Sequence, residues 1–134
     1  MIFVTGLAIN TGFALAALAA LVTFCVHTFV GGRFAAAPLL VAPDLAPATR
    51  WLNYMTWHMV TALLAVMTIA LGWSAFQQAG AVPVVVLLLV LSGLLSGVTI
   101  AVTLKAGIRP WRFPSSYLFL IILACALWGL GNPS

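Results

Sequence analysis

Four long apolar runs, none containing a charged side chain, constrain this 134-residue chain more than any other feature. Crossing the hydrocarbon core of a bilayer takes about 20 helical residues, so each run is interpreted as a transmembrane helix, the fourth being the shortest. The predicted spans are residues 7–30, 51–76, 83–104 and 115–130. The short alternating segments typical of a membrane β-barrel do not occur. The sequence therefore predicts one all-α domain over residues 1–134, a polytopic membrane protein built as an up-down bundle of four helices.

Composition leads to the same fold class. Hydrophobic residues make up 65% of the chain and charged residues 4%, whereas about a quarter of the residues of a soluble domain are charged. So few charges cannot cover a surface in water, and the partner that this composition requires is the lipid bilayer.

The basic residues indicate how the chain is oriented. All of them lie in two of the three connections between spans: Arg33, Arg50, Lys105, Arg109 and Arg112. Because basic loops stay in the cytoplasm, loops 31–50 and 105–114 are predicted to be cytoplasmic and both termini to face the outer side. Although the net charge is +4, five basic residues beside membrane spans do not form a nucleic-acid surface, and no nucleic-acid partner is expected.

The first connection is predicted to be a long loop. Gly31-Gly32-Arg33 is expected to end the first span, and Pro38, Pro43 and Pro47 should block regular helix between residues 33 and 50. This segment is expected to lie on the cytoplasmic membrane surface or to fold back over the helix ends as a lid.

Small residues predict where helices approach closely. Gly93 and Gly97 are four residues apart in the third span, and Ser92 and Ser96 have the same spacing beside them. Small residues at this interval let membrane helices pack tightly. The third span is therefore expected to be central or to pack very closely against a neighbour. Cys25 and Cys125 fall at different depths of spans one and four, so no disulfide is expected.

Polar side chains are predicted to gather in the cytoplasmic half. Counting at 1.5 Å per residue, His27 lies about 6 Å from the cytoplasmic end of its span and His58 about 10 Å from the end of its own. Ser96 and Thr99 in the third span and Tyr117 in the fourth lie at comparable depths. A site, if present, is expected in this layer, with the basic residues at its rim.

Several interpretations of this layer stay open. In the simplest, His27 and His58 are interfacial or hydrogen-bonded packing residues. In a second, they are the two axial ligands of a b-type haem, with Arg33 and Arg50 at the propionates.

A third interpretation is a Cu(I) site, because imidazole, thioether and thiol groups suit that ion. Its ligands would be His27, His58, Met55 and Met59, with Cys25 nearby. A fourth is a pocket for a quinone or lipid headgroup, attracted by the basic rim.

Enzyme and transporter chemistry has little support. Ser96 could act as a nucleophile with His58 as its base, but no carboxylate within the membrane could orient the histidine. The acidic side chain Asp44 lies in a loop, whereas coupled transporters use ionisable groups inside the membrane. No catalytic residue is assigned, and the protein is not expected to be an enzyme.

Three segments carry a resemblance: Val26–Arg33 with its His-x-x-x-Gly-Gly-Arg element, Pro38–Leu40, and Trp57–Thr61 with its Trp-His element. Through these the chain resembles a group of small bacterial four-helix membrane proteins that are uncharacterised. The resemblance covers most of the chain and brings no activity with it. What it implies is a location in the bacterial inner membrane.

The leading functional prediction is an accessory or structural subunit, because nearly all of the mass lies in the predicted spans. Such a subunit would pack against a larger membrane complex or against copies of itself. The alternative is a cofactor or ligand binder that uses His27 and His58 to hold haem, Cu(I), or a quinone or lipid headgroup.

Overall fold

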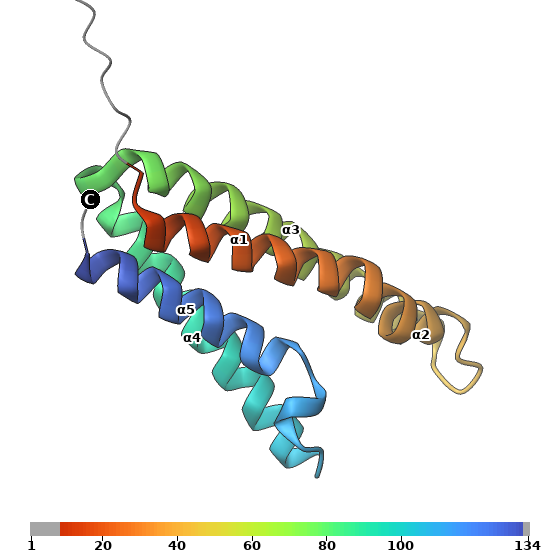
Figure 1. Cartoon of the computed structure of the whole chain (residues 1–134). Coiled ribbons are helices and arrows are strands. Elements are labelled where there is room, and N and C mark those ends of the chain that lie inside the picture. The colour runs from red at the N-terminus through yellow and green to blue at the C-terminus, as the bar shows by residue number, and fades with distance from the viewer. Residues whose placement is uncertain (1–8, 133–134) are drawn as a thin grey trace, which may run out of the picture.

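The chain folds into helices throughout the part that the structure, a computed structural model, describes, which is residues 9–132 (Figure 1). The elements are α1 (Thr11–Cys25), η1 (Val26–Ala36), α2 (Ala37–Val41), α3 (Pro47–Gln77), η2 (Gln78–Ala81), α4 (Val82–Lys105), η3 (Pro110–Arg112) and α5 (Ser115–Gly131). No strand occurs among these residues. The all-α prediction is confirmed, and residues 7 and 8 of the first predicted span lie outside the described range.

Three continuous helices are long and apolar enough to cross a membrane. They run over Thr11–Val41, Pro47–Gln77 and Val82–Lys105. The fourth, α5, has 17 residues and therefore extends about 25 Å at 1.5 Å per residue. The helices predicted over 51–76, 83–104 and 115–130 are present, each with slightly wider limits.

The first long helix does not end at Gly31–Arg33 as predicted. It continues through the π-helical segment η1 and through α2 to Val41, so the connection to α3 shrinks to residues 42–46. In the wide turn the N–H of Ala37 donates to the carbonyl of Gly32, five residues earlier. Pro38 falls at the second position of α2, directly after the π-helical segment, and Pro47 begins α3, where a missing N–H costs little.

All four long helices contribute to one buried apolar core, but they pack against one another unequally. Helix α1 is the central element, packed against α3 on one side and α5 on the other, while α4 packs against α5. Of the two alternatives predicted for the third span, close packing against one neighbour is the one observed. Helices α3 and α4 contact each other far less, and Figure 1 shows the α1–α3 pair and the α4–α5 pair diverging from the η2 turn.

One buried asparagine joins three helices at the end where the pairs meet. The side-chain oxygen of Asn10 accepts the N–H of Phe13 at 3.0 Å and so caps α1. Its amide donates to the carbonyl of Gly129 in α5 at 2.9 Å. Its backbone N–H donates to the carbonyl of Ala75 in α3, also at 2.9 Å. We call this end of the molecule, with Asn10, Gly12, Ala75 and Gly129, the closed end.

Two glycines allow the backbones of α1 and α5 to touch at the closed end. A Cβ atom on Gly12 would overlap the Cα atom of Gly129, and a Cβ atom on Gly129 would lie 2.8 Å from the side-chain oxygen of Asn10. Both glycines are buried. The closest approach through small residues is thus made by Gly12 and Gly129, whereas a Cβ atom on Gly97 would meet nothing within 4 Å.

Candidate functional site

The polar residues of the predicted layer fall into two groups, one in each helix pair. His27, Trp57 and His58 lie between η1 and α3, in the first pair. In the second pair the Ser96 hydroxyl donates to the carbonyl of Ser116 at 2.8 Å, joining α4 to α5. Because the pairs diverge, the four helices do not build a single polar layer, and the site must be sought within the first pair.

His27 is held by Trp57. The two rings stack with their centroids 4.2 Å apart and an angle of 12° between their planes. The Nε2 atom of His27 donates to the backbone carbonyl of Trp57 at 3.2 Å, and the Thr61 hydroxyl donates to the same oxygen at 3.2 Å. Gly31 leaves room for the indole, since a Cβ atom there would lie 2.8 Å from it. The contacts of His27 are those of a packing residue.

His58 pairs with a different ring. It is exposed and meets the Tyr54 ring edge-on, with centroids 4.4 Å apart. A bis-histidine haem needs both imidazoles to face one shared space, but His27 stacks on Trp57 and only His58 lines the cavity between the first helix and α3. The arrangement therefore does not fit a haem held between these two histidines.

The two arginines assigned to the haem propionates make other contacts. The Arg33 guanidinium lies 5.7 Å from the centre of the Phe34 ring, next to it in sequence. The Nε atom of Arg50 donates to the carbonyl of Leu45 at 2.8 Å and so fixes the short connection before α3.

Of the residues proposed for Cu(I), Met55, His58 and Met59 share one exposed face of α3 by their spacing, whereas His27 is stacked on Trp57. Met55 and Met59 are 53% and 63% exposed on α3, and Cys25 is partly buried at the end of α1. Within residues 9–132, no three side chains of the types His, Cys, Asp and Glu come together as metal ligands would. The thioethers could meet an ion only on the outer surface of α3.

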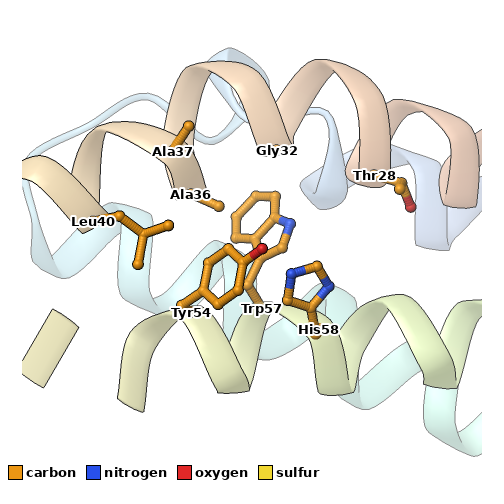
Figure 2. Close-up of a pocket in the computed structure, with 8 residues that line it drawn as sticks. All are labelled: Thr28, Gly32, Ala36, Ala37, Leu40, Tyr54, Trp57 and His58. Carbon is orange, nitrogen blue, oxygen red and sulfur yellow. The ribbon is translucent and has the colours of Figure 1, made fainter. Parts of the chain in front are cut away.

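A cavity of about 260 Å³ lies between the first helix and α3, beside His58 (Figure 2). The first helix contributes Thr28, Gly32, Ala36, Ala37 and Leu40, and α3 contributes Tyr54, Trp57 and His58. Of the predicted site residues, only His58 lines it. The cavity was missed because residues 33–50 were expected to be a loop, although the four-residue spacing of Thr28, Gly32, Ala36 and Leu40 was visible in the sequence.

The Thr28 hydroxyl has no hydrogen-bond partner although it is buried. Other threonines in these helices donate to the carbonyl four residues earlier, as Thr23 does to Ala19 at 2.7 Å and Thr99 to Leu95 at 2.8 Å. Thr28 lies in the π-helical segment, where the backbone bonds follow a different spacing, and it does not make this bond. In Figure 2 its oxygen lies on the side of the helix that faces α3.

Comparison with known proteins leaves the site to be interpreted from its own geometry. No family model, no curated protein and no solved structure matches this chain. The resemblance of the histidine segments to small bacterial membrane proteins stays a prediction.

Proposed function

We propose that this chain is a bacterial inner-membrane protein that crosses the bilayer four times, with both termini on the outer side. Three helices have the necessary length and apolar character. At about 25 Å, α5 can span a bilayer that thins locally. The connections 42–46 and 106–114 both lie at the ends of their helix pairs away from η2 (Figure 1). The basic residues lie in the second connection or in the helix segments next to the two connections, as the positive-inside rule requires of the cytoplasmic side.

Orientation is tested by fusing reporters after residue 134. A periplasmic reporter, such as alkaline phosphatase, should be active there, and a cytoplasmic reporter should be silent. The reverse pattern would place the termini in the cytoplasm and overturn this topology. A fusion after residue 105 serves as the opposite control.

We further propose that the protein is an accessory or structural subunit of a larger membrane complex. The observation that carries this proposal is the divergence of the two helix pairs. Because of it, α3 and α4 make few contacts with each other (Figure 1). The buried core includes residues of all four helices, but in a closed four-helix bundle each helix also packs along two neighbours, whereas α4 packs extensively only against α5. Helices that diverge can take up another membrane helix.

The surface of α4 supports this role. Gly93 packs inward, where an added Cβ atom would lie 3.5 Å from Leu123, but Gly97 is exposed and has nothing within 4 Å of such an atom. Ala101, one turn further, is also exposed. A helix face that contacts only lipid has no need of glycine, whereas close contact with another helix does.

The test is the mass of the protein after gentle extraction from its native membrane in mild detergent. The wild type should run as a complex with at least one other membrane protein. Gly97→Leu should lower the recovery of that complex at least fivefold, because the added side chain keeps a partner helix away. Ala62→Leu, which adds bulk at an exposed position on α3, is the matched control. A solitary chain after gentle extraction, or equal losses in both variants, would exclude this role.

Ligand binding is the second candidate function, favoured by the cavity beside His58. It does not depend on the subunit role, because the cavity lies wholly within the first helix pair.

A further inference from the structure

We propose that the cavity between the first helix and α3 binds the uncharged, planar ring of a membrane amphiphile, with a quinone as the best match. The inference rests on the proposed membrane location and is independent of the subunit role. Shape, hydrogen-bonding groups, charge and depth each contribute to it.

The cavity has the shape of a slot. Thr28, Gly32, Ala36 and Leu40 are spaced four apart and line it from the first helix, so they share one face of that helix. Gly32 has no side chain, and a Cβ atom placed on it would meet nothing within 4 Å. Gly32 thus leaves a gap in this wall of the cavity, opposite the rings contributed by α3.

Aromatic rings form the other wall. Tyr54, Trp57 and His58 all line the cavity from α3 (Figure 2). Small residues on one side and rings on the other favour a flat ligand, which can stack on the rings. A cavity of about 150 Å³ is enough for benzene, so the 260 Å³ found here accommodates a ring with several small substituents.

The polar groups of the cavity favour a ligand that accepts hydrogen bonds. The Thr28 hydroxyl is buried without a partner, and such a group gains from any acceptor that reaches it. Tyr54 and His58 can each donate as well. A quinone, whose carbonyl oxygens lie at opposite edges of a flat ring, presents acceptors on two sides at once.

The charge of the lining disfavours a phosphate headgroup. None of the eight lining residues is Arg, Lys, Asp or Glu. The nearest basic residue in sequence, Arg33, has its guanidinium over the Phe34 ring. Phosphate groups are normally held by arginine or lysine, so a neutral head fits this lining better than an anionic one.

The depth of the cavity suits an amphiphile. Gly32 lies 21 residues after Thr11, which is about 32 Å along the helix, close to the full thickness of the hydrocarbon core. Trp51 and Trp57 lie near the same level on α3, as expected of an aromatic belt. A ring bound here would sit at the membrane surface while its tail stays in the lipid.

The experiment measures binding of a radiolabelled benzoquinone with a decyl tail to the full chain in phosphatidylcholine nanodiscs, against empty nanodiscs. The wild type should bind saturably, with about one probe per chain. Gly32→Leu should weaken binding at least tenfold by filling the slot. Gly97→Leu, whose added side chain also enters open space, should leave binding unchanged.

A second variant tests the hydrogen bond and guards against misfolding of the first. Thr28→Val should weaken binding about fivefold, and Thr28→Ser should restore it. Retention of the label by empty nanodiscs equal to that by the protein would overturn the proposal, as would unchanged affinity in both Gly32→Leu and Thr28→Val. Equal competition by decyl phosphate would show an anionic-headgroup site and would also overturn it. Each of these results is separate from the recovery of a membrane complex, which tests the subunit role.

Discussion

The two ends of this molecule are built differently. At the closed end, Asn10 links three helices by hydrogen bonds, and Gly12 lets the backbones of α1 and α5 touch. At the opposite end, which holds the connections 42–46 and 106–114 and which we call the open end, the helix pairs diverge (Figure 1). There Thr28 keeps a buried hydroxyl without a partner beside a cavity.

The difference shows how a chain with few polar groups divides them between stability and binding. In lipid, helix association depends on close van der Waals contact and on hydrogen bonds, because no hydrophobic force separates helix from tail. The closed end combines both in the bonds of Asn10 and the contact of Gly12 with Gly129, whereas elsewhere single bonds join helices in pairs, from His27 to Trp57 and from Ser96 to Ser116. The open end has fewer contacts between helices. Its polar groups that lack a hydrogen-bond partner, such as the Thr28 hydroxyl, stay available to a ligand or partner.

The largest expected effect comes from breaking the backbone contact at the closed end. Gly12→Val should lower the free energy of unfolding by about 1–3 kcal/mol, the cost of forcing bulk into a filled interface, since its Cβ atom would overlap Gly129. The measurement is unfolding by SDS in mixed micelles. Gly97→Ala is the control and should be neutral or slightly stabilising. Equal destabilisation by the two changes would contradict the distinction between the ends.

Removing the asparagine should have the next largest effect. Asn10→Ala deletes a helix cap, worth about 0.5–2 kcal/mol, together with the bond to the Gly129 carbonyl. The same unfolding measurement applies. Asn53→Ala is the matched control, because the Asn53 side chain is exposed and donates only to Thr49 in its own helix. If the two variants are equally stable, Asn10 does not hold the helices together.

Threonine replacements at two positions compare the unpartnered hydroxyl of the open end with a bonded hydroxyl in the same long helix. Thr28→Val should raise the stability of the ligand-free protein by about 1 kcal/mol, because it removes a buried hydroxyl that lacks a partner. Thr23→Val should lower stability by a similar or smaller amount, since Thr23 is buried and bonds to the Ala19 carbonyl. Thermal unfolding without added ligand measures both. Effects of the same sign would show that the Thr28 hydroxyl has a partner after all.

The smallest effect is expected in the second helix pair. Ser96→Ala removes the bond to the Ser116 carbonyl, and such bonds between membrane helices average about 0.6 kcal/mol. Ser92→Ala is the control, because the Ser92 hydroxyl donates to Leu88 within α4. A loss above that of Asn10→Ala would mean that α4 and α5 depend on this bond more than the closed end does on its own bonds.

The helices could be predicted from the sequence because a long, uncharged apolar run can form little other than a membrane helix. The end of the first helix could not, since Gly31, Gly32 and Pro38 are the residues that end an ordinary α-helix. A π-helical segment accommodates the two glycines here, and Pro38 follows it at the start of α2. Gly31 also has a packing role, since it makes room for the Trp57 indole.

The candidate site was predicted only in part. His58 was identified and lines the cavity, but the stacking of His27 on Trp57 depends on the rotation of each helix about its axis. Counting residues gives depth and does not give this rotation. Asn10 was overlooked because it falls inside a predicted span, although an asparagine directly before a helix is a typical cap.

The bond from Asn10 to Gly129 joins residues 119 positions apart, and this separation sets an order of assembly during synthesis. The α1–α3 pair and the α4–α5 pair can each form as its second helix enters the bilayer. The contact between α1 and α5 has to wait until α5 has been inserted. Until then the face of α1 around Gly12 is covered only by lipid or by the insertion machinery, so joining the two pairs at the closed end is the step that completes folding.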